Sequence, residues 1–324
     1  MEASPGHAGR VVCRLVPFGF VSGDYNEATQ KAIMKPLNEY TFNDWQRLRP
    51  VTHWLKTLRY NAERNAYVSR PARVIDAALN DRIRGQRVLV TIAFDDPEAI
   101  DMQVRLIARF VADVVHVIAD ISMDNDASAQ TAAVAAHGHA PYVRLPANPL
   151  RRQDQASRTH GLALDWVWHN IIRHGEPDRF GFIDHDVFPT GPDDPFAMLD
   201  RQPVYGWIRE VGPRWFLPAG FSMFRFDAVK NLPLDFSQDW FNGLDTCGAN
   251  WGVLFSKLDR GKLTFAPTHF EPYKPGADPI KAPIQWSGVW LHEVGSTRRE
   301  GPAALAADKR RVIKELLAPH LVAS

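Results

Sequence analysis

The chain has 324 residues, 45% of them hydrophobic, and a formal net charge of +1. This length holds one large domain, alone or with an appendage. A charge near zero argues against broad electrostatic binding to nucleic acid or to an anionic membrane. Two distant cysteines, Cys13 and Cys247, make no disulfide framework or zinc motif. The first ten residues lack the pattern of a signal peptide, so we expect a cytoplasmic protein.

Residues 1–84 differ in pattern from the rest of the chain. Val11–Val16 predicts a short strand, and Asn43–Asn65 and Pro71–Ile83 predict two helices, the second ended by Gly85. The pattern in this stretch indicates no chemistry. We expect a helical N-terminal extension that decorates the fold or makes a homo-oligomer contact.

A regular alternation of elements begins at Arg87. Apolar runs of strand length alternate with helical patterns. The predicted strands are Val88–Phe94, Val114–Ala119, Tyr142–Leu145 and Phe180–Val187, and the predicted helices are Ile100–Ala112, Ala127–Ala136 and Ser157–Arg173. Because these runs do not alternate between apolar and polar residues, as strands buried on both faces do not, we expect an α/β fold with a parallel sheet covered on both faces. Aromatic residues and prolines dominate after Pro195, which predicts a mixed sheet with loops.

The last of these predicted strands ends in two carboxylates, Asp184 and Asp186. Alternation along a strand places them on the same side, where they repel each other unless a cation lies between them. At the carboxyl end of a buried strand, the candidate is a divalent ion that carries a phosphorylated ligand. The alternative is a strand end whose two aspartates cap a turn, which Thr190-Gly191-Pro192 supports. Further acidic residues follow the earlier strands and can face the same crevice: Asp95, Asp96 and Asp120.

Several motifs occur in a fixed order along the chain. They are acidic ends on two early strands, a helix with Arg158-Thr159-His160-Gly161, the acidic Asp184-His185-Asp186, and a late Trp290-Leu291-His292. This ordered set resembles the GT-A fold glycosyltransferases, particularly their family-2-like branch, over residues 87–299. The resemblance implies a Rossmann-like sheet in residues 85–324, preceded by the helical extension 1–84. Residues 85–190 would then form the nucleotide-sugar half and residues 191–324 the acceptor half.

The resemblance also implies a binding site for the donor. In such enzymes the first two strand ends hold the base and the ribose, which assigns that role to Asp95 and Asp120 here. Asp120 has an alternative role as a cap of a helix or turn. Arg158 would face the diphosphate from the start of its helix, where the helix dipole also attracts phosphate. Arg151 and Arg152 are rival phosphate contacts, or else part of a solvated loop.

A metal site follows from the same resemblance. Asp186 would bind Mn²⁺ or Mg²⁺ directly, and Asp184 would contact the ribose or a metal-bound water. His292 resembles a late histidine that completes the metal site in several GT-A enzymes, although a histidine beside a tryptophan is also a common core residue. Imidazole together with carboxylates suits Mn²⁺ better than a purely oxygen set does. His185 points to the opposite face and is expected to be structural.

An inverting glycosyltransferase needs a carboxylate that takes the proton from the attacking hydroxyl. By resemblance, Asp245 at a loop-to-helix junction is the first candidate, Asp239 the second and Glu210 the third. The alternative for Asp245 is a cap of the helix that starts near Thr246. The family usually carries an acidic pair at this place, whereas this chain has Asp-Thr, so a retaining mechanism stays open.

We therefore expect a metal-dependent, hexosyltransferase-like enzyme that moves a sugar from a nucleotide-diphosphate sugar to an acceptor hydroxyl by inversion. The acceptor would be a glycan, a lipid-linked molecule or a small molecule, and not a nucleic acid. The enzyme would lie in the cytoplasm, free or peripheral at the inner face of the membrane. The rival interpretations are a nucleotidyltransferase of similar fold and an inactive sugar-nucleotide-binding protein. The acidic, glycine-free Phe94–Pro97 argues against the nucleotidyltransferase.

Overall fold

The computed structural model describes residues 37–150, 156–240, 242–278, 282–295 and 303–322. The predicted strand Val11–Val16 and the rival phosphate contacts Arg151 and Arg152 lie outside the described residues. Up to the acidic motif the elements are α2 (Phe42–Gln46), α3 (Arg49–Val68), α4 (Leu79–Ile83), β1 (Arg87–Ala93), α5 (Pro97–Phe110), β2 (Val115–Asp120), α6 (Asn125–His137), β3 (Tyr142–Arg144), α7 (Ala156–Val167), a π-helical turn (Trp168–Ile172), α8 (Arg173–Gly175) and β4 (Arg179–Asp184).

The second half is made of shorter elements. They are β5 (Val187–Pro189), β6 (Val204–Gly206), β7 (Arg209–Val211), β8 (Arg214–Phe216), β9 (Phe221–Arg225), α9 (Phe226–Val229), β10 (His269–Pro272), β11 (Pro283–Ser287), β12 (Trp290–His292) and α10 (Ala303–Leu321). Single turns of 3₁₀-helix lie at Leu37–Glu39, Ala197–Asp200, Gly248–Trp251, Phe255–Lys257 and Arg260–Lys262.

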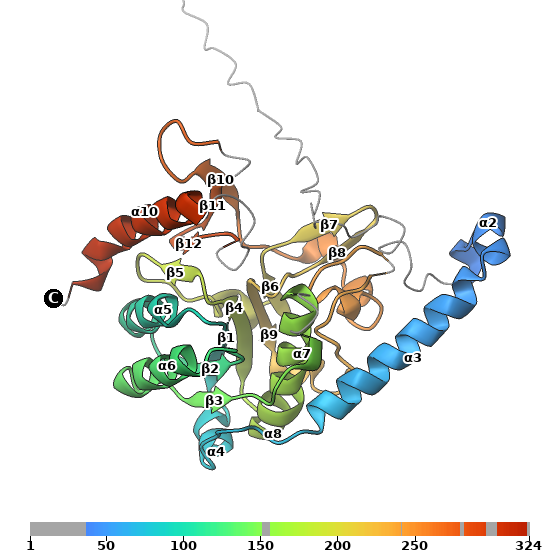
Figure 1. The fold of residues 1–324 in the computed structure, drawn as a ribbon, viewed down its shortest axis with the longest axis horizontal. Coiled ribbons are helices and arrows are strands. Elements are labelled where there is room, and N and C mark those ends of the chain that lie inside the picture. Colours follow the sequence, from blue (N-terminus) through green and yellow to red (C-terminus); the bar gives the residue numbers. More distant parts are fainter. Residues whose placement is uncertain (1–36, 151–155, 241, 279–281, 296–302, 323–324) are drawn as a thin grey trace, which may run out of the picture.

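A six-stranded sheet with the order β3-β2-β1-β4-β9-β6 forms the centre of the molecule. The first four strands are parallel, and β9 and β6 continue the sheet in antiparallel pairing. Figure 1 shows α5 and α6 on one face of this sheet and α7 on the other. The predicted α/β class is thereby confirmed, and so is the expected parallel half followed by a mixed half.

The central strand β1 is mostly apolar because both of its faces are buried. Val88, Val90 and Ile92 belong to the core that contains the α7 side chains. The alternate Leu89 packs with Ile107 of α5 on the opposite face. Successive residues of a strand point to opposite faces, so a strand covered by helices on both sides needs residues that are apolar or, like Thr91, hydrogen-bonded inside the protein.

The predicted strand Phe180–Val187 is wrong at its end. β4 stops at Asp184, His185 and Asp186 form a turn, and β5 starts at Val187. The reason is that β5 leaves the main sheet and pairs antiparallel with β12, in a second sheet of order β10-β11-β12-β5. The two carboxylates therefore lie at the junction of two sheets rather than along one strand.

Two predicted helices of the N-terminal part also differ from the structure. Asn43–Asn65 is interrupted at Leu48, which has a φ of 51°, and a new helix begins before Pro50 because proline fits the first turn but not a helix interior. In the predicted helix Pro71–Ile83 only Leu79–Ile83 is helical. The preceding Val74 instead bridges to Arg144 at the edge strand β3.

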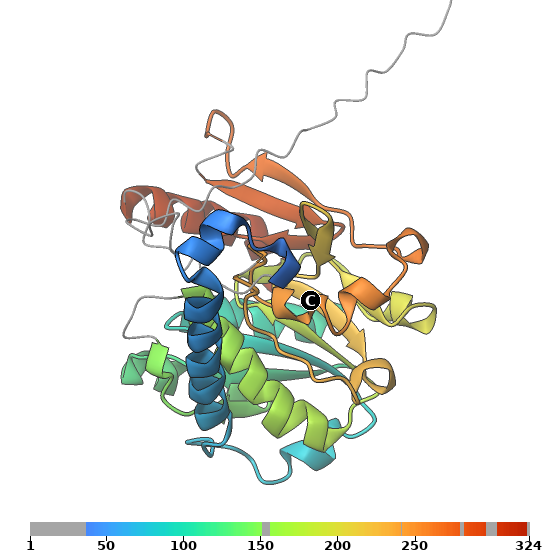
Figure 2. The same ribbon diagram turned by 90° about the vertical axis from the view of Figure 1, so that its right-hand side faces the viewer.

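Helix α3 runs beside α7 (Figure 2). Its last turn carries the fully buried Tyr67, which shares the main hydrophobic core with β1. Arg64 of α3 donates from Nε to Oδ2 of the buried Asp165 in α7 at 2.7 Å. The division of the chain at residue 84 stays a prediction.

Candidate metal centre and its surroundings

Three side chains from distant parts of the chain meet at the carboxyl edge of the parallel strands. Asp184 ends β4, Asp186 lies in the turn after it, and His292 ends β12. One ligand atom from each side chain lies within 4.8 Å of the others. The pairing of β12 with β5 brings them together, because it places His292 opposite Val187. Glu293 N–H then donates to the Asp186 carbonyl at 2.9 Å.

His292 has the orientation and tautomer of a metal ligand. Its Nδ1 lies 3.0 Å from Gln285 Oε1, and its ring stacks on Trp207 with centroids 5.1 Å apart. An amide oxygen only accepts hydrogen bonds, so in the neutral ring Nδ1 carries the proton and Nε2 has the lone pair. This Nε2 lies 3.3 Å from Asp186 Oδ1. An imidazole nitrogen and a carboxylate oxygen that face each other in this way form a donor set that fits a divalent ion.

The close approach of Asp184 to the sheet depends on Gly220. A Cβ atom at position 220 would lie 2.8 Å from Asp184 Oδ2 and 2.9 Å from the Trp207 ring. Asp184 N–H donates to the Gly220 carbonyl at 3.2 Å. Its carboxylate is 31% exposed, whereas that of Asp186 is only 6% exposed. Asp184 is therefore the member of the cluster that opens toward solvent.

His160 adds an imidazole to the surroundings of the cluster. It belongs to the motif Arg158-Thr159-His160-Gly161, which predicted no role for it. Its Nε2 lies 3.8 Å from Asp184 Oδ1. Burial lowers the pKa of His160, although the charges of Asp184 and Asp245 act in the opposite direction. The next residue, Gly161, lets α7 approach closely, since a Cβ there would lie 2.8 Å from the Cα of Ser237. A neutral imidazole thus faces the carboxylate at the open side of the cluster.

Asp95, Asp120 and Arg158, which are expected to hold the base, the ribose and the diphosphate, lie in three different environments. Asp95 is exposed, and its Oδ1 accepts the backbone N–H groups of Met123 and Asp124 at 2.7 and 3.1 Å. Asp120 is fully buried, and its carboxylate accepts from Ser122 N–H, from Ser128 Oγ and from Tyr142 Oη at 2.7 Å. These bonds turn its oxygens toward Ser122, α6 and β3, whereas the N-cap of α6 is Asp124.

Arg158 does not point toward the metal cluster. Residues two apart on a helix face in nearly opposite directions, and His160 faces the cluster. The Arg158 guanidinium lies over the rings of Tyr60 and Trp240, at 5.3 and 4.8 Å from their centroids, and 3.9 Å from Glu63. Arg158 is thus placed between α3 and the loop around Trp240.

The candidate bases differ in how they are placed. Asp245 Oδ1 accepts from Gln238 Nε2 and Thr246 N–H, and Oδ2 lies 3.3 Å from Arg209 Nη1. Burial alone raises the pKa of Asp245, but the Arg209 guanidinium and these hydrogen bonds outweigh it and hold this pKa below its usual value. Asp239 accepts from Asn242 within a turn, and Glu210 forms a surface ion pair with Arg260.

No protein-family model and no curated protein sequence matches the chain. Solved structures do match it. A mannosyltransferase from Pyrobaculum calidifontis, in complex with GDP-Man and Mn²⁺, is 11% identical with a TM-score of 0.34, and the match covers 56% of each chain. The galactosyltransferase LgtC is 16% identical with a TM-score of 0.44, covering 73% of this chain and 97% of the other. Glucosyl-3-phosphoglycerate synthase from Mycobacterium tuberculosis is 17% identical with a TM-score of 0.38, covering 79% and 87%.

These likenesses concern the fold and say nothing of substrate or mechanism. The chain spans only about half of the length of the mannosyltransferase. Within the described part of the chain, no helix has the length and apolarity to cross a membrane. Fold and site together define an α/β protein with a candidate divalent-metal centre at the carboxyl edge of its parallel strands.

Proposed function

We propose that the protein is a metal-dependent glycosyltransferase that moves a hexosyl group from a nucleotide-diphosphate sugar to an acceptor hydroxyl. The observation that carries the proposal is the convergence of Asp184, Asp186 and His292 where parallel-sheet proteins bind their ligands. Asp186 and His292 would hold Mn²⁺ or Mg²⁺, and Asp184 would face the ribose or a metal-bound water. When bound, the ion neutralises the charge that develops on the departing diphosphate.

The chain's own residues supply the rest of the donor site. Asp95 supports the base side, because its carboxylate orders the backbone at Met123 and Asp124 beside the end of β1. Asp120 would act on the ribose side indirectly, because its carboxylate accepts the N–H of Ser122 and so fixes the backbone there. Arg158 would meet the diphosphate by leaving the rings of Tyr60 and Trp240, on which it now lies.

Transfer would proceed by inversion with Asp245 as the general base. The Asp245 carboxylate is ionised at neutral pH, as an acceptor of the hydroxyl proton must be, and the Arg209 contact that lowers its pKa also fixes its orientation. The next residue, Thr246, donates from Oγ1 to the Ser157 carbonyl at 3.3 Å, which supports a position of the base close to α7, the helix that carries His160. The acceptor would be a glycan, a lipid-linked molecule or a small molecule.

The N-terminal helices present a surface for a further contact. Apolar side chains on α2 and α3 are exposed, namely Phe42, Trp45, Val51, Trp54, Leu55 and Leu58. Lys56 and Arg59 of α3 are exposed as well, and so is Arg47 between α2 and α3. Such a combination supports peripheral attachment to the inner face of the membrane or a homo-oligomer contact. Flotation with anionic vesicles and light scattering on the free protein distinguish the two.

The experiment that tests the proposed function is a thermal-shift screen of nucleotide-diphosphate sugars, each measured with and without Mn²⁺. A ligand that binds only the folded state raises its stability by mass action. We expect one class of nucleotide sugar to raise the melting temperature in Mn²⁺ and to lose most of this effect in Asp186→Asn. A panel in which every nucleotide sugar acts equally with and without metal would contradict the proposal.

A further inference from the structure

One buried side chain of α5 holds both ends of the turn that carries the metal carboxylates. Gln103 is fully buried, and its Nε2 donates to the carbonyl oxygens of Asp184 and Val187, both at 2.8 Å. These carbonyls flank the turn of His185 and Asp186, where the chain leaves the main sheet. A single amide group therefore closes this turn from the α5 side.

The orientation of the Gln103 amide is itself fixed by a second buried residue. With both Nε2 protons directed to carbonyls, Gln103 Oε1 must accept, and the Thr91 hydroxyl donates to it at 2.7 Å. The Thr91 oxygen then accepts from Nε2–H of His116 at 2.9 Å. A chain of hydrogen bonds thus runs from His116 in β2 through Thr91 in β1 to the turn.

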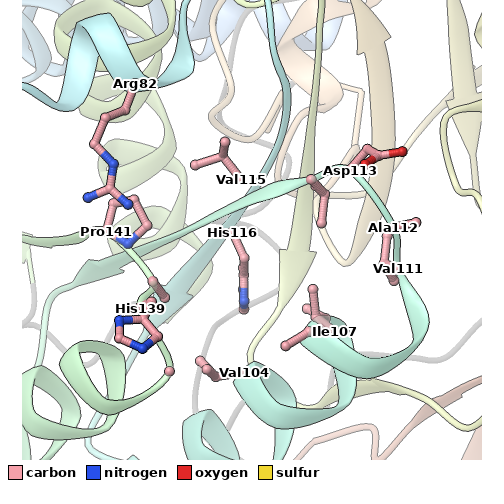
Figure 3. A pocket seen from close by; sticks show the side chains of 14 residues that line it. Arg82, Val104, Ile107, Val111, Ala112, Asp113, Val115, His116, His139 and Pro141 are labelled. Atoms are coloured by element: carbon pink, nitrogen blue, oxygen red, sulfur yellow. The ribbon is translucent and has the colours of Figure 1, made fainter.

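The chain of hydrogen bonds starts far from the metal cluster, near the amino end of β2. His116 lines a cavity of about 340 Å³ under the end of α5, together with Val104, Ile107, His139 and Pro141 (Figure 3). Burial lowers the pKa of His116 to about 3, so its imidazole is neutral at physiological pH. A neutral ring with its proton on Nε2 is the tautomer that the bond to Thr91 requires.

We propose that Gln103 is a positioning residue for the metal centre, with Thr91 and His116 holding its amide in the working orientation. By closing the turn at Asp184 and Val187, Gln103 sets the spacing at which the carboxylates of Asp184 and Asp186 meet an ion. Outer-shell partners of this kind typically change metal affinity about 10- to 100-fold when they are removed. This proposal rests on the proposed function, because it assigns the turn a metal to hold.

Gln103→Met removes both donors at nearly constant volume. We expect it to raise the dissociation constant for Mn²⁺ by about 10- to 100-fold. We also expect faster hydrogen exchange of the amides in residues 184–188, measured on the metal-free protein. Thr91→Val should raise the dissociation constant and the exchange rates as well, but to a smaller extent. Thr91→Ser keeps the hydroxyl, so both quantities should stay near the parent values. If Gln103→Met does not fold, the comparison of Thr91→Val with Thr91→Ser tests the proposal in its place.

The matched control is Asn170→Leu. Asn170 Nδ2 also bridges two carbonyls, those of Val68 and Trp166, both at 3.0 Å, but on the α3–α7 side of the molecule. Asn170→Leu should lower the stability of the protein without changing Mn²⁺ binding or the hydrogen exchange of residues 184–188. Equal losses of stability in Gln103→Met and Asn170→Leu, with both turn readouts at parent values, would overturn the positioning role. If the parent itself binds no Mn²⁺, the metal-dependent function fails, and hydrogen exchange alone decides the role of Gln103.

Discussion

Gly161 offers a sharp test of the packing that places α7 against the loop of the candidate base. An added Cβ would lie 2.8 Å from the Cα of Ser237 and 3.2 Å from the Phe236 carbonyl oxygen. Both are backbone atoms, which cannot rotate away as a side chain can. Overpacking of this kind costs about 1–3 kcal/mol, and the short contact places it at the upper end. Alanine in a helix recovers about 1 kcal/mol over glycine. The net prediction for Gly161→Ala is a loss of about 1–2 kcal/mol.

Thermal unfolding by circular dichroism measures this loss. For a chain of this size we expect a fall in melting temperature of roughly 2–6 °C. The control is Gly252→Ala, whose Cβ would meet nothing within 4 Å and whose φ of −67° suits any residue. It should be neutral or stabilising by about 0.4–1 kcal/mol. A Gly161→Ala protein as stable as the parent would refute the close approach of α7 to Phe236 and Ser237.

Three further predictions concern the site. Asp245→Asn should lower turnover about 100- to 10,000-fold at near-parent donor affinity, whereas Asp239→Asn should do much less; the reverse ranking in steady-state kinetics would move the base to Asp239. Gln285→Leu removes the acceptor of His292 Nδ1 and should raise the Mn²⁺ concentration for half-maximal binding about 10- to 100-fold; an unchanged titration would show that Gln285 does not orient His292 for the metal. Because the pKa of His116 is about 3 in the folded state, against about 6.5 unfolded, the unfolded state binds more protons between these values. Stability is therefore lost as the pH falls below about 6.5, by up to about 1.4 kcal/mol per pH unit. His116→Phe should lack this contribution in urea unfolding between pH 6.5 and 5, and parallel curves would contradict the burial of a neutral ring.

The central elements of the fold were predictable because a buried parallel strand can be recognised from its own residues. β1 and β2 are buried along almost their whole length and mostly apolar, and acidic residues mark their ends. The start of α5 was set too late, since the helix begins at Pro97 with Asp96 as its cap. That cap was readable as an Asp-Pro pair, which favours a helix start.

Errors arose where pairing with a distant segment decides the local structure. The apolar run through Val187 gives no sign that β5 joins another sheet, because its partner β12 lies about a hundred residues later in the chain. In the same way, Val74 is extended because it pairs with Arg144, not because of its neighbours. Hydrophobic periodicity reports burial and says little about which partner covers the residue.

The metal cluster itself was recoverable from the order of motifs, whereas its supporting residues were not. The resemblance pointed to Asp184, Asp186 and His292, and the structure brings these three together. Gln103 precedes Asp184 by 81 residues along the chain, and an isolated glutamine in a helix carries no recognisable signal. His160 could have been noticed from its place in the motif of α7, one residue before the glycine that allows close packing.

The most direct test of the central claim is calorimetric titration of the protein with Mn²⁺, comparing the parent with Asp186→Asn. The substitution keeps the shape of a side chain that is 6% exposed and removes the charge of the carboxylate that His292 faces. The account predicts one Mn²⁺ site in the parent, and its loss or strong weakening in Asp186→Asn while the melting temperature shows that the fold persists. An Asp186→Asn protein that binds Mn²⁺ with parent stoichiometry and affinity would contradict it.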